Sequence, residues 1–237
     1  MFETDAFSLI VLFVGLSILP FVAMVATSYL KIVVVMSLIR NALGIQSIPP
    51  NMVLNALAMI LTFYIMAPIA SESWAIAKQE LAAPAASQTG AQAAGTPAAA
   101  NQPSNFLSLN TEAVAKAAEP FRNFLSSHTS PRERAFFIST AETLWGKDGE
   151  PAVVDPESFY ILLPSFCVSE LTKAFQIGFL VYLPFIAIDI IVSNILLAMG
   201  MMMVSPVTIS LPFKLLLFVM VNGWTMLIQG LIRGYIL

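Results

Sequence analysis

Charged residues are distributed so unevenly along this chain of 237 residues that four long segments contain almost none. The segments are residues 6–30, 41–71, 174–213 and 215–232, and Asp189 is the only charged residue in them. A helix needs about 20 apolar residues to cross a hydrocarbon layer about 30 Å thick. The distribution therefore predicts an integral membrane protein with four long apolar segments arranged in two pairs.

The overall composition supports the membrane class and excludes several others. Hydrophobic residues make up 58% of the chain and charged residues 11%, whereas soluble proteins contain about 25% charged residues. The net charge of −3 argues against nucleic acid as a partner. Cys167 and His128 are the only residues of their types, so no disulfide, metal site or cofactor is expected.

The charge pattern divides the chain into three regions, all of them expected to be helical. Residues 1–71 form a first hydrophobic hairpin, residues 72–154 a polar region, and residues 155–237 a second hydrophobic hairpin. Within the polar region, the Ala-rich stretch 82–103 is typical of a flexible loop. Cap and stop signals predict a helix from Asn110 or Thr111 to Ser127, one from Pro131 to Gly146, and a helix start at Asp155-Pro156.

The basic residues near the apolar segments predict an orientation in the membrane. Glu3 and Asp5 stand where a signal peptide would carry a basic stretch, so the first segment is interpreted as a retained helix. Lys31 and Arg40 place the first short loop in the cytoplasm. The polar region then lies in the periplasm, and a turn near Lys214 returns the chain to the cytoplasmic side.

Proline residues lie in or beside the apolar segments. They are Pro20, Pro68, Pro164, Pro184, Pro206 and Pro212. A single helix over residues 174–204 would be about 46 Å long, which exceeds one membrane span, and Pro184 is expected to kink it. Broken helices at membrane depth are tolerated where they are buried in protein or line a water-filled path. The expected architecture is therefore two kinked hairpins.

Four charged residues in or beside the second hairpin are candidate functional groups: Glu170, Lys173, Asp189 and Lys214. Glu170 and Lys173 are three residues apart, so they share a helix face and can form an ion pair. A lone acid at a helix centre costs about 2.5–3.5 kcal/mol on insertion, so Asp189 must be paired or face water. One interpretation is the titrating group of a secondary transporter or ion channel. The favoured one is an ion pair between helices or subunits, with Lys214 as a candidate partner.

No enzyme activity is expected, because the chain contains no GxSxG, HExxH, Walker or GxGxxG motif. Its most unusual local feature is a run of three methionines, Met201, Met202 and Met203, between Gly200 and Pro206. Methionine is flexible and polarizable and fills irregular gaps. A ring of such side chains from several subunits would seal a pore and deform around a passing chain. Packing inside an ordinary core is the alternative interpretation.

Several motifs together resemble the FliP/SctR family, the main export-gate subunit of bacterial type III secretion. The second hairpin carries most of them: residues 169–180 (SELTKAFQIGFL), Leu183-Pro184-Phe185, Asp189, residues 198–203 (AMGMMM), residues 209–214 (ISLPFK) and Asn222-Gly223-Trp224. The rest are residues 38–44 (LIRNALG), Pro49-Pro50-Asn51, His128-Thr129 and Arg132-Glu133-Arg134. The version Arg40-Asn41-Ala42-Leu43-Gly44 is more similar to the injectisome branch than to the flagellar branch.

The resemblance implies an all-α subunit of a helical, cone-shaped oligomer in the bacterial inner membrane, much of it at or above the periplasmic face. The assembly would be a homo-pentamer joined by smaller FliQ/SctS-like and FliR/SctT-like subunits, and contacted by the export switch protein, the large export-gate protein, inner rod protein and membrane lipid. Unfolded substrate proteins would pass along its axis. Met201, Met202 and Met203 would close the pore, and Glu170, Lys173, Asp189 and Lys214 would form pairs between helices or subunits.

Overall fold

The computed structural model describes residues 6–45, 48–89, 111–146, 152–201 and 203–236. Every regular element in these ranges is a helix, which confirms the all-α prediction. The helices are α1 (Ala6–Val25), α2 (Tyr29–Ala42), α3 (Asn51–Thr89), α4 (Thr111–Ala117), α5 (Glu119–His128), α6 (Pro131–Trp145), α7 (Phe159–Ala198), α8 (Pro206–Met220) and α9 (Gly223–Arg233).

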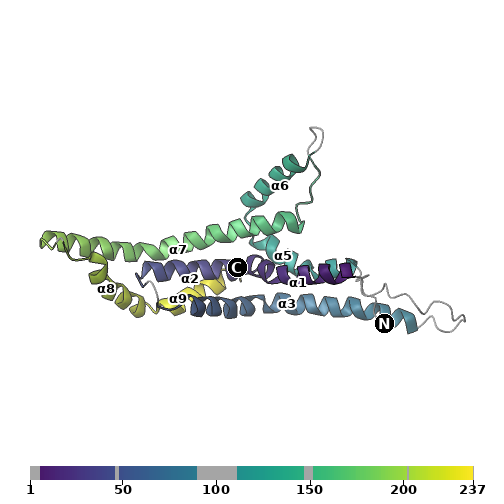
Figure 1. The fold of residues 1–237 in the computed structure, drawn as a ribbon, viewed down its shortest axis with the longest axis horizontal. Coiled ribbons are helices and arrows are strands. Elements are labelled where there is room, and N and C mark those ends of the chain that lie inside the picture. Colours follow the sequence, from purple (N-terminus) through teal and green to yellow (C-terminus); the bar gives the residue numbers. More distant parts are fainter. Residues whose placement is uncertain (1–5, 46–47, 90–110, 147–151, 202, 237) are drawn as a thin grey trace, which may run out of the picture.

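The helices form an elongated bundle in which α2 lies between α7 and α3 (Figure 1). The α8 helix folds back from the far end of α7, and α9 follows it toward the middle of the bundle. The α6 helix projects away from the bundle and packs against α7. The described part of the chain is therefore long and narrow, with the α7–α8 turn at one end.

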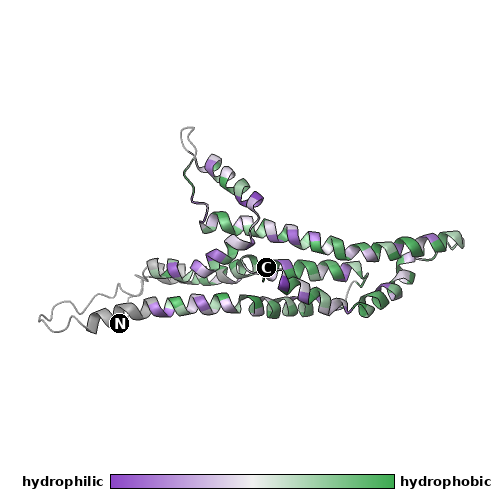
Figure 2. Cartoon of the chain, turned by 180° about the vertical axis from the view of Figure 1, so that it is seen from behind, coloured by the Kyte–Doolittle hydropathy of each residue, from purple (hydrophilic) through white to green (hydrophobic). Residues whose placement is uncertain are grey.

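Two helices are long and apolar enough to cross a membrane, α7 and residues Asn51–Gln79 of α3. Two further spans exist if each bent pair counts as one: α1 with α2, bent by 57°, and α8 with α9, bent by 58°. Figure 2 shows that hydrophobic residues dominate these helices, whereas polar residues gather on α6 and on the outer part of α3. The structure thus supports between two and four spans.

The turn of the second hairpin differs from the prediction. The sequence suggests a turn near Lys214, because a charge usually marks the end of an apolar span. Instead α7 ends at Ala198, and Lys214 lies inside α8. Its charge is tolerated there because it forms an ion pair with Asp189. The 40-residue α7 also runs through Pro164 and Pro184 without ending.

Several helix boundaries also differ in detail. The predicted helix from 111 to 127 is two helices, α4 and α5, and Pro120 lies in the first turn of α5. Gly146 ends α6 as predicted. The α3 helix continues to Thr89, into the Ala-rich stretch, because alanine is the strongest helix former. Residues 90–103 of that stretch lie outside the described residues.

Buried side chains are concentrated around α2. Ile32, Val35, Met36 and Ile39 are almost completely buried and form one face of this helix. Gly178 of α7 permits the close approach of α2, since a Cβ there would lie 2.3 Å from Leu38 Cδ1. A smaller second cluster joins α5 to α7 through Phe124, Leu125, Leu162 and Phe166.

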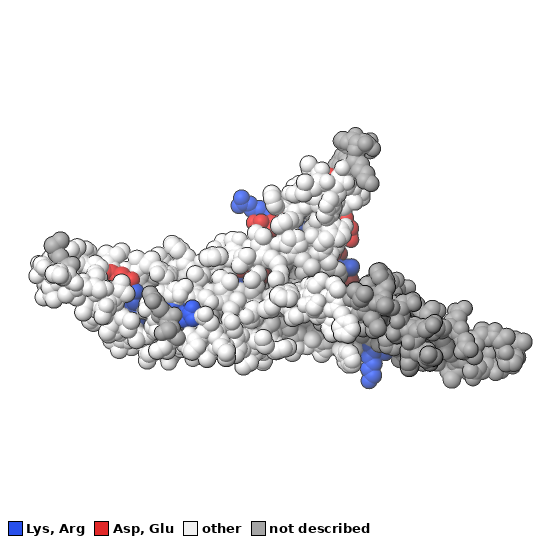
Figure 3. Space-filling view, viewed as in Figure 1, with Lys and Arg blue, Asp and Glu red and all other residues white. Residues whose placement is uncertain are grey.

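Much apolar surface remains uncovered in the single chain. Phe63 on α3 is 70% exposed and Phe179 on α7 is 62% exposed. Figure 3 shows that charged side chains occupy only small patches of the face viewed. Contiguous apolar surface of this extent is typical of contact with other proteins or with lipid.

Candidate functional site

The methionine loop, which comprises residues 199–205, joins α7 to α8. Gly200 has φ +74° and ends α7 in a left-handed conformation that glycine adopts without strain. The Gly200 amide donates to the Leu197 carbonyl and the Met201 amide to the Leu196 carbonyl, both over 3.0 Å. This pair of bonds is a Schellman motif, so the chain leaves α7 along a fixed path.

The other end of the methionine loop is also defined by helix-end chemistry. Ser205 precedes α8 in an extended conformation, and Pro206 occupies the first turn of α8, where its missing amide hydrogen costs nothing. Between these ends the methionine side chains are uncovered by the chain itself. The exposed fractions are 66% for Met199, 42% for Met201 and 100% for Met203. Met202 lies outside the described residues.

The Asp189 cluster, made of Asp189, Ser210 and Lys214, ties α7 to α8 near the methionine loop. Lys214 Nζ lies 2.6 Å from Asp189 Oδ2, and Ser210 Oγ donates to Asp189 Oδ1 over 2.5 Å. Lys214 Nζ also donates to the carbonyl of Ala42, the last residue of α2, over 3.3 Å. A cation is favourable at that position, because helix C-termini carry partial negative charge.

The geometry of this cluster favours a structural role for Asp189. Both of its carboxylate oxygens accept a bond from the same chain, and Lys214 is only 5% exposed. The structure thus brings together the two residues that the sequence suggests as partners. They join helices within one subunit.

The Glu170 cluster lies nearer the N-terminus of α7 than the Asp189 cluster does. It contains Glu170, Lys31, Lys173 and Tyr235. Glu170 is completely buried, and its Oε2 lies 3.0 Å from Lys31 Nζ, whose side chain is 3% exposed. Its Oε1 lies 3.0 Å from Lys173 Nζ. Tyr235, which follows α9, donates its hydroxyl to Glu170 Oε2. One carboxylate thus holds α2, α7 and the segment after α9 together.

One further contact connects this cluster to the polar region, and another lies within the cluster. Lys173 Nζ donates to the His128 carbonyl at the end of α5 over 2.6 Å. Lys31 Nζ lies 3.5 Å from the centre of the Tyr235 ring, which adds a cation–π attraction. Burial, and then the charge of Glu170, raises the pKa of the Tyr235 hydroxyl. Tyr235 therefore remains a neutral donor to Glu170.

The sequence predicts the pairing of Glu170 with Lys173 but not the participation of Lys31 and Tyr235. The charge pattern places Lys31 in a short cytoplasmic loop, whereas the structure buries it in α2. Helical periodicity contained the missing signal, because Lys31 falls on the same face as the buried apolar residues of α2. The buried residues of that face are Lys31, Ile32, Val35, Met36, Ile39 and Ala42.

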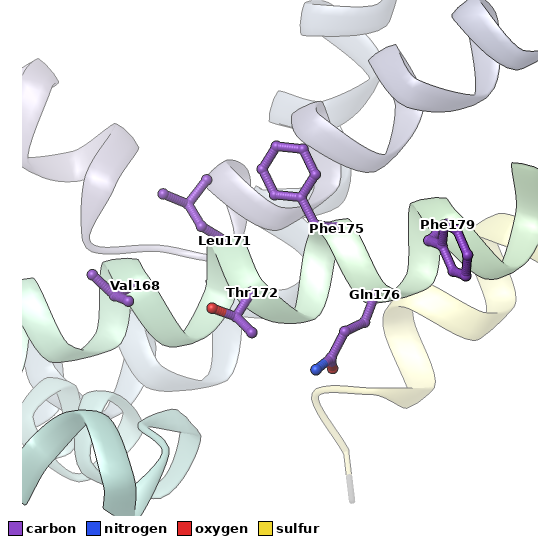
Figure 4. Close-up of a pocket in the computed structure, with 6 residues that line it drawn as sticks. All are labelled: Val168, Leu171, Thr172, Phe175, Gln176 and Phe179. Carbon is purple, nitrogen blue, oxygen red and sulfur yellow. The ribbon is translucent and has the colours of Figure 1, made fainter.

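An exposed apolar ridge runs along one face of α7, from the level of the Glu170 cluster toward that of the Asp189 cluster. Figure 4 shows its side chains, all of which come from α7 alone. They are Val168, Leu171, Thr172, Phe175, Gln176 and Phe179. Phe175 is 58% exposed, so within one chain the ridge contacts little else.

Comparison with known proteins gives consistent matches over nearly the whole chain. The FliP family matches residues 12–231. The Yop proteins translocation protein R of Yersinia pestis is 48% identical over 236 residues, covering 98% of this chain and 97% of that protein. The hypersensitivity response secretion protein HrcR of Ralstonia nicotianae is 44% identical over 228 residues, covering 96% of each. The flagellar biosynthetic protein FliP of Bacillus subtilis is 40% identical over 227 residues, covering 96% of this chain and 90% of that protein.

Proposed function

The chain belongs to the FliP family, and from this premise we propose that it is the main pore-forming subunit of a type III secretion export gate. It conducts unfolded proteins across the bacterial inner membrane. The observation that carries the proposal is the methionine loop, which presents uncovered methionines at the end of a long hairpin. The relatives named for translocation of Yop proteins and for secretion in the hypersensitivity response favour an injectisome over a flagellar system.

The pore closes, in this proposal, when methionine loops from several copies meet on the axis. Met201, Met202 and Met203 are unbranched, so they fill the gap between copies and change rotamer when a polypeptide passes. The Schellman motif at Gly200 and the proline at position 206 fix both ends of the loop. The methionine side chains can therefore change conformation while the two ends of the loop stay in place.

The charge clusters keep the hairpin rigid while a polypeptide passes through the pore. Glu170, Lys173, Asp189 and Lys214 bond within the chain and link α7 to α2 and α8. Rigid hairpins transmit the position of one subunit to the next, so the loops stay in register. This role requires neither catalysis nor a cofactor.

The proposed assembly is a homo-pentamer that also contains FliQ/SctS-like and FliR/SctT-like subunits. The exposed ridge on α7 and the exposed aromatic residues of α3 supply apolar surface for these contacts. The switch protein, the large export-gate protein, inner rod protein and transported substrates contact the assembly in turn. It lies in the inner membrane and extends above the periplasmic face.

We expect the chain to purify as an oligomer and not as a stable monomer. Co-expression with its neighbouring genes and extraction in detergent should give a particle whose mass contains several copies of this subunit. Mass photometry or native mass spectrometry measures this directly. A stable monomer under the same conditions would refute the proposed assembly.

An ion-pair role and a titrating role for Asp189 predict different results for paired substitutions. Asp189→Asn leaves Lys214 buried without its partner, which costs toward the lower end of about 3–5 kcal/mol, since Asp189 is one-third exposed. Asp189→Asn combined with Lys214→Met removes both charges and should recover most of the lost complex and secretion. Recovery is measured by the amount of assembled complex and by secreted substrate.

The transporter alternative gives the opposite result for the double variant. A transporter with Asp189 as its titrating group stays inactive when the carboxyl is missing, whatever replaces Lys214. Proton or ion flux through the purified subunit, abolished in both variants, would support that alternative and count against a passive conduit.

A further inference from the structure

An apolar groove of about 470 Å³ lies between α7, α8 and α9. All of its lining residues are apolar or glycine, among them Ile177 and Pro184 from α7, Phe218 from α8, and Met226 and Gly230 from α9. The helices that form it are the candidate membrane span α7 and the bent pair α8–α9. The groove therefore opens on surface that is suited to hydrocarbon.

The groove stays open because of the bend between α8 and α9 and because of one glycine. Asn222 adopts φ +51°, and the helix axes diverge there by 58°. Farther along α9, a Cβ built on Gly230 would meet no neighbouring atom within 4 Å. Space therefore remains beside Gly230 that no side chain of the described residues fills.

The groove is short, and none of its lining residues has a polar side chain. Its α9 wall runs from Gly223 to Leu231, a length of about 12 Å at 1.5 Å per residue. A flexible apolar chain can follow the bend between α8 and α9 and needs no hydrogen-bond partner from this lining.

A cation follows the last groove residue of α9, Leu231, by two positions. Arg233 is exposed and follows Gly230 by three residues, so it lies about one helical turn farther along α9 on a neighbouring face. No acidic side chain among the described residues lies within ion-pair distance of it. Tyr235, two residues after Arg233, donates a hydrogen bond to Glu170. The Arg233 end of the groove therefore lies at the level of Lys173, which pairs with Glu170 and whose side chain is 39% exposed. The apolar groove thus ends beside positive charge.

We propose that the groove binds an anionic phospholipid, with one acyl chain between α7 and α9 and the phosphate beside Arg233. An apolar groove with a basic residue at its end matches both parts of such a lipid, because arginine at the end of an apolar helix reaches toward the headgroup region. A bound lipid would fill the space that the α8–α9 bend leaves, and would support the hairpin that carries the methionine loop.

Photo-crosslinking in vesicles tests this site with the whole assembled complex. The vesicles are phosphatidylcholine with a trace of phosphatidylglycerol that carries a photoreactive group near the end of one acyl chain. We expect crosslinks in the peptides that contain Ile177–Phe185 and Gly223–Leu231. Gly230→Leu fills the groove and should reduce these crosslinks to background.

A second variant tests the headgroup without changing the groove. Arg233→Gln should reduce crosslinking by about fivefold, since one basic residue near an anionic surface contributes about 1 kcal/mol and 1.4 kcal/mol corresponds to a factor of ten. Gly15→Leu is the matched control, because Gly15 also has open space around it but lies on α1, and its crosslinks should equal those of the wild type.

Three results would overturn the proposal. Absence of groove crosslinks in the wild-type complex would mean that another subunit covers the groove. Crosslinking that survives Gly230→Leu would place the lipid elsewhere on the chain. Equal crosslinking by phosphatidylcholine and phosphatidylglycerol probes, unchanged by Arg233→Gln, would exclude recognition of the anionic headgroup.

Discussion

Assembled complexes in which Met201, Met202 and Met203 are all replaced by alanine are expected to leak small solutes in the absence of substrate. Each substitution removes a long flexible side chain from the loop, so the loops of neighbouring subunits no longer fill the axis. Entry of a membrane-impermeant dye into cells, or ion flux in proteoliposomes that hold the complex, measures the leak. The expected change is from a tight barrier to one that dissipates a gradient.

The size of the new side chain should set the size of the leak. Substitution by leucine keeps most of the apolar volume but loses flexibility, so we expect the pore to remain nearly tight while secretion slows. Substitution by glycine should leak at least as much as alanine. This order separates the filling of a gap from general damage to the loop.

A control triple variant distinguishes the loop from methionines elsewhere. Met52 and Met59 on α3 and Met220 on α8 are each at least half exposed, and their replacement by alanine should leave the barrier tight. If the loop variant assembles normally and remains as tight as the wild type, the methionine seal is wrong.

The sequence alone was sufficient for the helical class and for the residues that bracket the methionine run. Long uncharged segments require helices, because a membrane offers no partner for unpaired backbone groups. Gly200 and Pro206 flank the methionine run in the sequence, and in the structure they lie at the end of α7 and at the start of α8. These features depend on local chemistry, which a single sequence contains.

The errors arose where charges are paired in three dimensions. Hydropathy treats each charged residue as the edge of an apolar segment, so it assigns both Lys31 and Lys214 to loops. In the structure each lies inside a helix and is neutralised by an acid that is distant in the sequence, Glu170 or Asp189. Tyr235 gave no signal of its own, since its role depends on the position of Glu170.

Replacing Glu170 by glutamine should destabilise the subunit more than any other single substitution in the two charge clusters. The change leaves Lys31, 3% exposed, without a negative partner in the protein interior, and breaking a buried pair in this way costs about 3–5 kcal/mol. The cost of leaving Lys173 without Glu170 is smaller, because the Lys173 side chain is 39% exposed. Denaturant or thermal unfolding of the complex in detergent, followed by helical circular dichroism, measures the loss.

Substitutions around Glu170 should follow an order set by burial. Tyr235→Phe removes one hydrogen bond to a charged group and should cost about 1.5–3 kcal/mol. Glu170→Gln combined with Lys31→Met removes both buried charges and should recover much of the stability. Glu119→Gln is the control, because Glu119 is 48% exposed in its pair with Arg122 on α5 and pairs at the surface contribute about 0–1 kcal/mol.

The double variant Glu170→Gln with Lys31→Met distinguishes a role of the buried ion pair in folding from a role in secretion. If Glu170→Gln with Lys31→Met unfolds as easily as Glu170→Gln alone, the cost does not come from an unpaired lysine, and the proposed role of the Glu170 cluster is incorrect. If stability returns but secretion does not, the pair serves the moving gate rather than the folded subunit. Recovery of both is the expected result, because the contacts of Glu170 lie within one chain and join elements that must pack before the methionine loop is positioned.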